Sequence, residues 1–169
     1  LTGTGTATWP DGQKYVGSWK NGKQNGTGTM IYASGYKYVG SWKNNKKNGI
    51  GTQTWPSGQK YVGSWKNGEQ NGTGTMTYSS SQKYVGSWKN GKKSTGTYIS
   101  ASGKETFYVE GEELSESERT DYVNKQANEE RLRVAKLCAN QAKDAKTEYA
   151  AKKIESTCLE GYGYGDNKV

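Results

Sequence analysis

The sequence contains no histidine, one phenylalanine and two cysteines in 169 residues. Without histidine the chain cannot build the nucleophile–histidine systems of hydrolases or most catalytic zinc sites. Two cysteines without histidine also supply too few ligands for a structural zinc site. A carboxylate pair is the remaining catalytic option, and the first 110 residues hold only four scattered acids. The sequence therefore predicts no catalytic residue, no cofactor, no metal site and no enzymatic activity.

Long apolar runs are also missing, and no segment is long enough to cross a membrane as a helix. Leu, Ile, Val and Phe are so scarce that a chain of this charge would ordinarily be disordered. The six tryptophans and thirteen tyrosines argue against disorder. Each large ring can bury about 150–250 Å², so the composition predicts a thin core made of rings.

Arginine is absent from residues 1–110, which carry fourteen lysines against four acids, a net charge of +10. Residues 111–169 carry ten basic and twelve acidic residues, a net charge of −2. This asymmetry predicts two parts, 1–110 and 111–169. A basic surface attracts nucleic acid, anionic membranes or acidic proteins, although solubility alone would also account for the charge.

A 23-residue repeat runs through the first part. Such a period indicates one supersecondary unit per repeat, stacked in a row. Trp9 and Trp55 open alternate units where Tyr32 and Tyr78 stand in the others, which suggests that a tandem pair was itself duplicated. The repeated residues are Tyr15, Tyr38, Tyr61 and Tyr84, then Gly17, Gly40, Gly63 and Gly86, then Trp19, Trp42, Trp65 and Trp88.

Within a unit, Asn21-Gly22 predicts a two-residue hairpin turn of type I′, because both residues tolerate positive φ. Counting outward gives the expected partners across the hairpin. These pairs are Trp19 with Gln24, Gly17 with Gly26, and Tyr15 with Gly28. Since strand side chains alternate between faces, the rings would lie over a floor of glycines. The predicted fold is mainly β, an elongated antiparallel sheet of tandem β-hairpins, followed by a C-terminal α-helical segment folded as a helical hairpin.

The opposite face of the predicted sheet carries lysines at both ends of every first strand. With strands about 4.8 Å apart, each hairpin would advance by about 10 Å. The lysines would then form two parallel rows on one side, a candidate surface for an anionic ligand. They are Lys14, Lys20, Lys37, Lys43, Lys60, Lys66, Lys83 and Lys89.

The string YVGSWKNGKQNGTGTMIYASG resembles the membrane occupation and recognition nexus (MORN) repeat. The matching positions are Tyr15, Gly17, Trp19, Gly22, Gly26, Gly28 and Gly35. The resemblance covers residues 1–103, although Asn45 and Ser81 replace glycines of the pattern and the fourth unit lacks one residue. It implies a grooved single sheet and a binding or scaffolding role, with acidic lipids or partner proteins as contacts. The part from there to residue 110 would be a C-terminal cap.

Two functions remain open. The first is a protein–protein interaction module, in which the aromatic groove or a sheet edge holds a protein or peptide, or the chain's own C-terminal helix. The second is binding of acidic phospholipid or another polyanion by the lysine rows. Glycan binding is a weaker third hypothesis, and no base-reading groups indicate sequence-specific nucleic-acid recognition. The aromatic candidates for partner contact are Trp9, Tyr32, Trp55 and Tyr78.

Residues 115–160 are rich in Ala, Glu, Lys and Arg and free of glycine and proline, which predicts helix. Ser115 or Ser117 could cap its start. The expected apolar face is narrow and comprises Tyr122, Ala135, Cys138 and Ala142, then Ala151, Ile154, Cys158 and Leu159. A Gly/Tyr-rich tail follows.

Cys138 and Cys158 are twenty residues apart, or about 30 Å along one unbroken helix. A disulfide needs Cα atoms about 4.4–6.8 Å apart, so a bond between them requires a helical hairpin. The turn would lie near residues 142–146, with Asp144 or Thr147 capping the second arm. A disulfide implies an oxidising compartment, so a periplasmic or secreted protein is expected, which could also associate with a membrane. Two free thiols in a reduced helix are the alternative.

Overall fold

The computed structural model describes residues 2–143 and 147–162. The chain divides into two compact units, Leu1–Leu114 and Ser115–Val169, and each is described by itself. The first is one antiparallel sheet and the second is helical. The predicted hairpin array followed by a helical segment is confirmed.

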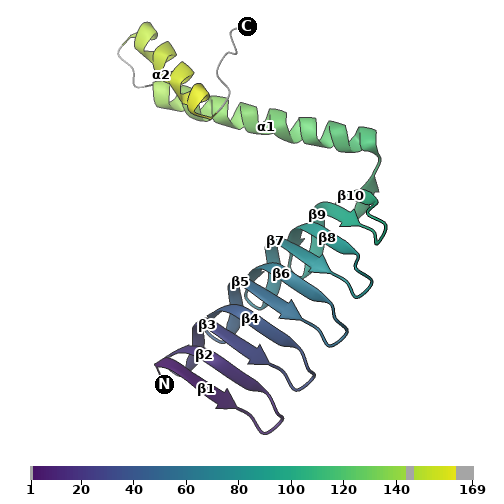
Figure 1. The fold of residues 1–169 in the computed structure, drawn as a ribbon. Coiled ribbons are helices and arrows are strands. Elements are labelled where there is room, and N and C mark those ends of the chain that lie inside the picture. The colour runs from purple at the N-terminus through teal and green to yellow at the C-terminus, as the bar shows by residue number, and fades with distance from the viewer. Residues whose placement is uncertain (1, 144–146, 163–169) are drawn as a thin grey trace. The chain divides into compact units, whose positions relative to one another are not determined.

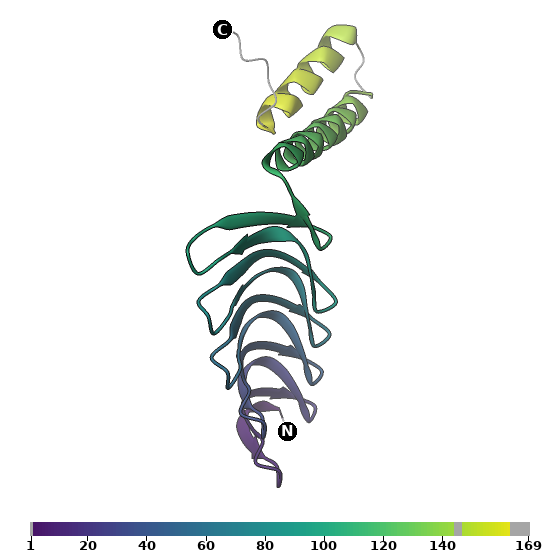
Figure 2. The ribbon, with the colours of Figure 1, turned by 90° about the vertical axis from the view of Figure 1, so that its right-hand side faces the viewer.

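The sheet has eleven strands, and each strand pairs with the next one along the chain. Figure 1 shows the hairpins following one another along the array, and Figure 2 shows that their strands are bent. The strands are β1 (Gly3–Thr8), β2 (Lys14–Lys20), β3 (Lys23–Ile31), β4 (Lys37–Lys43), β5 (Lys46–Thr54), β6 (Lys60–Lys66), β7 (Glu69–Thr77), β8 (Lys83–Lys89), β9 (Lys92–Ile99), β10 (Glu105–Val109) and β11 (Glu112–Leu114).

The hairpin turns have the predicted geometry. Asn21 and Gly22 have φ angles of 52° and 74°, the positive pair that a type I′ turn requires. In the second unit, Asn45 stands at the glycine position and adopts φ 64°. Asparagine tolerates this region better than other side chains, so the turn survives the substitution.

The core consists of rings laid on glycines, as predicted. Tyr38 is fully buried, and a Cβ added to Gly51 would lie 2.3 Å from its hydroxyl oxygen. The hydroxyl donates a hydrogen bond to the Ser41 carbonyl oxygen at 3.0 Å. Trp65 from the next unit packs edge-on against Tyr38, with ring centroids 5.3 Å apart. Its indole N–H donates to the Gly51 carbonyl oxygen at 3.2 Å, which ties one unit to the next.

Part of the predicted register is wrong. Trp19 lies opposite Gln24 as expected, but Gly17 pairs with Gly28 rather than with Gly26. Tyr15 accordingly pairs with residue 30, a methionine, and not with Gly28.

A β-bulge causes the difference. Between the two pairs flanking it, Ser18 on β2 opposes three residues of β3, Asn25, Gly26 and Thr27. The shift of two residues preserves the alternation of faces, so the rings stay where they were predicted. Gly26 has φ 97°, and a Cβ there would lie 2.9 Å from the Ser18 Cβ. Glycine is therefore needed at this position for the bulge and for the close approach of Ser18, and not to make room for an aromatic ring.

The array ends in a short hairpin of β10 and β11. Phe107 pairs with Leu114, so the sheet continues beyond the predicted boundary at residue 110. The two units meet instead between Leu114 and Ser115. A fifth turn with two positive φ angles, at Glu110 and Gly111, carries the chain past the expected end of the array.

The helical unit comprises α1 (Glu116–Ala142) and α2 (Glu148–Gly161), which begin at two of the predicted caps. Ser115 caps α1 and forms a reciprocal capping box with Glu118. Thr147 caps α2, and its hydroxyl accepts a hydrogen bond from the Ala150 N–H at 3.1 Å. The alternative cap, Asp144, lies outside the described residues.

A disulfide joins the helices of this unit. It links Cys138 of α1 to Cys158 of α2, whose Cα atoms lie 5.5 Å apart, as the hairpin prediction requires. Val134 and Ala142 are buried beside Cys138. Val134 takes the place that the sequence assigned to Ala135, which is only half-buried. The side chains of Ala151 and Ile154 lie outside the described part of the unit.

Candidate functional site

Eight exposed lysines mark the ends of four strands. β2, β4, β6 and β8 each begin and end with a lysine, and all eight side chains are exposed. A seven-residue strand spans about 20 Å between its terminal residues, so the lysines form two rows separated by about that distance. The rows are Lys14, Lys37, Lys60 and Lys83 at one end, and Lys20, Lys43, Lys66 and Lys89 next to the two-residue hairpin turns.

The turn end of the strands is the more strongly basic. Besides its row of four, it carries three exposed lysines that begin the return strands, against Glu69 at the same position in the third unit. We call the resulting set the lysine edge. It consists of Lys20, Lys23, Lys43, Lys46, Lys66, Lys89 and Lys92.

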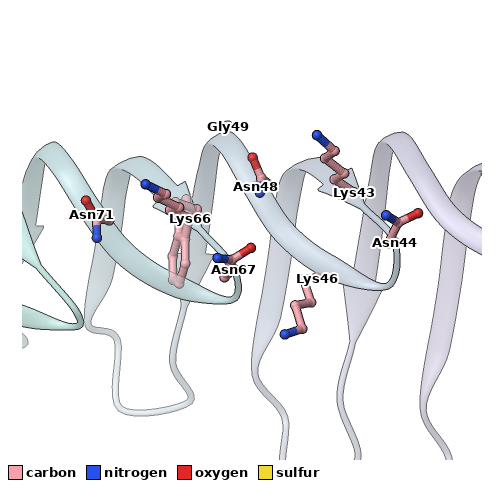
Figure 3. Close-up of a pocket in the computed structure, with 9 residues that line it drawn as sticks. Lys43, Asn44, Lys46, Asn48, Gly49, Lys66, Asn67 and Asn71 are labelled. Atoms are coloured by element: carbon pink, nitrogen blue, oxygen red, sulfur yellow. The ribbon is translucent and has the colours of Figure 1, made fainter.

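A polar hollow of about 680 Å³ lies on this edge between the second and third hairpins. Figure 3 shows Lys43, Lys46 and Lys66 around it, with asparagine side chains between them. These asparagines are Asn44, Asn48, Asn67 and Asn71. Ammonium groups and amide N–H donors together suit anionic oxygens.

The charge of the lysine edge is not neutralised within the described chain. Within residues 2–143 and 147–162, none of its seven lysines forms a salt bridge, and the pair between Arg133 and Glu130, at 3.5 Å, lies in the helical unit. The lysine edge thus keeps its positive potential.

Backbone hydrogen bonds hold the turns of neighbouring hairpins together. The Gly68 N–H donates to the Lys47 carbonyl oxygen at 2.9 Å, and the Gly91 N–H donates to the Gln70 carbonyl oxygen at 3.0 Å. In the second unit, Asn45 both donates its N–H to the Gln24 carbonyl oxygen and accepts from the Gln24 N–H. The spacing of the lysines is therefore fixed by the backbone ladder rather than by flexible loops.

The four aromatic candidates lie at equivalent places just after every second strand. Trp9 is the most open of them, with 38% of its surface exposed. Tyr32, Trp55 and Tyr78 are half-buried and pack against the ring core. Three of the four thus lie at the edge of the core, and only part of each ring is exposed to a partner.

Two further lysines face the rings, and the sequence reasoning missed them. The ammonium nitrogen of Lys47 lies 4.6 Å from the ring centre of Trp65 and 5.2 Å from that of Tyr38. Lys93 has the same place one pair of units later, 5.2 Å from Tyr84. The position alternates as Gln24, Lys47, Gln70 and Lys93, so the 46-residue period of the duplicated pair was the signal for it.

Burial changes the acidity of these groups. Desolvation lowers the pKa of Lys47 from 10.5 to about 8, and its ammonium group donates to the Gln53 side-chain oxygen. Desolvation raises the pKa of Tyr38 well above its ordinary value, with a smaller contribution from Tyr32. Lys47 is thus a satisfied interior cation, enclosed by three rings.

Candidate metal and catalytic groups do not gather in the described residues. Within them, no cluster of three or more His, Cys, Asp or Glu side chains could hold a metal ion. The same residues include no helix that is both long and apolar enough to span a membrane. The chemistry that the described surface offers is that of lysine, asparagine and aromatic rings.

Comparison with known proteins identifies the repeat. A sequence model of the MORN repeat matches residues 1–14, 15–35, 38–60, 61–83 and 84–105. No curated protein matches the chain. A matching solved structure is the SAS-4 (dCPAP) TCP domain in complex with a proline-rich motif of Ana2 (dSTIL) of Drosophila melanogaster. That match is 12% identical, covers 66% of this chain and 87% of that chain, and has a TM-score of 0.22, too low to carry an argument.

Proposed function

Because the chain belongs to the MORN-repeat family, whose repeats mediate protein or membrane interactions, we propose that its hairpin array is a non-catalytic module that binds closely spaced phosphates through the lysine edge. The observation that carries this proposal is the lysine edge itself, seven exposed lysines of which none forms a salt bridge within the described residues. An acidic phospholipid membrane is the proposed ligand surface.

The repeat geometry supports a flat, extended ligand over a single small molecule. Successive hairpins place equivalent lysines about 10 Å apart, and each lysine near an anionic membrane contributes about 1 kcal/mol. Several weak contacts on a rigid array then add up, because the turns are already ordered by hydrogen bonds such as that from Gly68 to Lys47. Each lysine acts as a point charge on a flexible stem, without specificity for one headgroup.

Vesicle co-sedimentation tests the proposal. The chain should bind phosphatidylcholine vesicles only when they contain phosphatidylserine, and moderate salt should release it by screening. Reversing four turn-row lysines to glutamate should weaken binding by more than tenfold. These lysines are Lys20, Lys43, Lys66 and Lys89.

The other lysine row provides a matched control with the same change in net charge. It is reversed at Lys14, Lys37, Lys60 and Lys83. Binding should then fall much less, because the lysine edge is untouched. Equal losses in the two variants would mean that net charge alone drives binding, and equal binding to neutral vesicles would exclude the membrane reading.

A protein or peptide partner is the second candidate function. It is supported by an open hollow on the ring side of the array, beside Tyr84 and Lys93. The sheet edge, the docking of the chain's own helix and glycan binding remain predictions.

The disulfide supports a further part of the proposal, a periplasmic or secreted location, because such bonds persist in oxidising compartments. Thiol labelling of the chain trapped directly from its native compartment tests this. Unlabelled cysteines that become reactive only after reduction would support it, and prompt labelling would contradict it.

A further inference from the structure

The last buried tyrosine of the array has one tryptophan contact fewer than the tyrosines before it. Each of the first three buried tyrosines contacts its own unit's tryptophan and that of the next unit. Tyr38, for example, lies 5.1 Å from Trp42 and 5.3 Å from Trp65, both edge-on. Tyr84 contacts Trp88 at 5.4 Å, and no second indole reaches it from the described chain.

The register explains why the next indole is missing. Gly51 pairs with Gly63, which precedes Trp65 by two residues. In the last unit, Gly96 takes the place of Gly51 and pairs with Tyr108. The residue at the tryptophan position is therefore Glu110. There the chain already turns, with Glu110 at φ 52° and Gly111 at φ 94°. The strand β10 stops at Val109, so this hairpin supplies no indole at that position.

A hollow of about 270 Å³ remains beside Tyr84. It lies wholly within the hairpin array, and residues from β8, β9, β10 and the last turn line it. They are Tyr84, Lys93, Ser94, Tyr98, Tyr108 and Gly111. Tyr108 stands where earlier units have glycine, and the hollow persists next to its ring.

The equivalent place one pair of units earlier shows what fits there. At that place the Trp65 ring lies 4.6 Å from the Lys47 ammonium nitrogen. The edge of Tyr38 meets the ring, and the Gly51 carbonyl oxygen accepts the indole N–H at 3.2 Å. A cation, a tyrosine edge and a backbone acceptor thus define an indole site.

The last unit repeats the components of this site. Lys93 corresponds to Lys47 and lies 5.1 Å from Tyr78 and 5.2 Å from Tyr84. Gly96 corresponds to Gly51. Lys93 is exposed, however, whereas Lys47 is half-buried under its indole.

We propose that the hollow beside Tyr84 and Lys93 binds the indole ring of a tryptophan side chain presented by a partner protein. The ring completes the stack on Tyr84, receives the Lys93 ammonium on its face and donates its N–H to the backbone at Gly96. A tryptophan is a common anchor of protein interfaces, and its ring is the best partner for a cation. The inference deepens the protein-partner function proposed second and is independent of the anionic ligand.

Fluorine NMR of 5-fluoroindole added to the full chain tests the site. The fluorine signal should shift and broaden with saturable, millimolar binding, as suits so small a ligand. Blocking the N–H, with 1-methyl-5-fluoroindole as probe, should weaken binding about fivefold, the value of one hydrogen bond. Equal binding of the two probes would contradict the proposed orientation.

Two variants locate the binding on the protein. Tyr108 pairs with Gly96 on the ring face and lines the hollow, so Tyr108→Trp enlarges the ring that borders it and should strongly weaken binding, with an unchanged urea midpoint confirming that the ring core is intact. Lys93→Met should weaken binding about two- to fivefold through the lost cation–π contact. Its matched control, Lys92→Met, alters an exposed neighbour that does not line the hollow and should change nothing. Unchanged binding in Tyr108→Trp would overturn the site.

Competition with peptides tests whether the site accepts a tryptophan within a polypeptide chain. The pentapeptide Gly-Gly-Trp-Gly-Gly should compete with 5-fluoroindole, and Gly-Gly-Leu-Gly-Gly should not. Failure of the tryptophan peptide while 5-fluoroindole still binds would overturn the protein anchor. Vesicle binding of Tyr108→Trp should equal that of the wild-type chain, so that failure here and failure of the lysine edge can be told apart.

Discussion

The hairpin array and the helical unit stabilise themselves in opposite ways. In the array, every unit repeats the same contact of a tyrosine with glycine backbone and of a tryptophan with the unit before it. In the helical unit, one disulfide and a few small side chains such as Val134 and Ala142 join α1 to α2. A sequence poor in aliphatic residues can therefore build a core either by repetition or by a covalent link. The first gives a rigid surface of regular spacing, which is what a lysine edge requires.

Removing one inter-unit indole should break the array most severely. Trp65→Ala deletes a buried ring that contacts Tyr38 and Tyr61 and donates to Gly51. The expected loss is about 3–5 kcal/mol in the free energy of unfolding, the usual cost of a large buried ring. Urea denaturation followed by tryptophan fluorescence measures it. Trp9→Ala, at a 38% exposed ring, is the control and should cost far less.

Reducing the disulfide should affect the helical unit alone. All six tryptophans lie in the array, so their fluorescence reports on it, whereas far-ultraviolet ellipticity at 222 nm reports on the helices. Reduction should destabilise the helical transition by about 3 kcal/mol in the chain-entropy model and leave the fluorescence transition in place. A fluorescence midpoint that moves with reduction would show that the two units unfold together.

Adding one methyl group under a ring should cost the array about 1–3 kcal/mol. In Gly51→Ala the new Cβ would meet the Tyr38 hydroxyl and ring at 2.3–2.6 Å, and the ring must move. Thr52→Ala, one residue along on the opposite face, is the matched control and should have a smaller effect. Equal effects would mean that the glycine serves strand geometry and not the ring.

The smallest expected effect is a pH dependence at the enclosed lysine. The folded chain releases the Lys47 proton near pH 8, whereas an unfolded chain keeps it to about 10.5. Between these values the unfolded state binds more protons, so stability should rise with pH. The gain should stay below about 1 kcal/mol, because solvent screens the partly exposed group.

Lys47→Met provides the reference for this measurement. The difference in unfolding free energy between the wild-type chain and Lys47→Met should change in favour of the wild type from pH 8 to 10. The raised pKa of Tyr61, about 12, acts equally in both chains and cancels. Lys46→Met, an exposed neighbour, should show no such trend. A difference that is constant with pH would refute the account of Lys47.

The repeat made most of the fold predictable, and the exceptions have physical causes. The period, the type I′ turns and the ring face all follow from residues such as Tyr15 and Asn21. The bulge at Gly26 did not, because a glycine in a strand can serve a close contact or a positive φ equally well. The fourth unit shows the difference, since its one-residue deletion removes the bulge glycine and leaves Ser94 and Thr95 opposite Ser87.

The candidate site was predictable only in part. The lysine rows follow from alternation, which the two-residue bulge preserves. The 46-residue alternation marks Lys47 as unusual, but its enclosure did not follow from the sequence, because only the three-dimensional stack supplies Trp65 from the next unit. The hollow at Lys93 arises from a turn at Glu110 that interrupts the repeat, and absent side chains leave no motif in a sequence.

The most direct test of the ring-on-glycine account is a double-mutant cycle at Gly51 and Tyr38. Unfolding free energies are measured for the wild-type chain, Gly51→Ala, Tyr38→Leu and the double variant. Once Leu replaces the ring, the added methyl group should cost less than about 0.5 kcal/mol, giving a coupling energy above about 0.5 kcal/mol. If Gly51→Ala is equally costly with and without the Tyr38 ring, the glycine is not there to receive it.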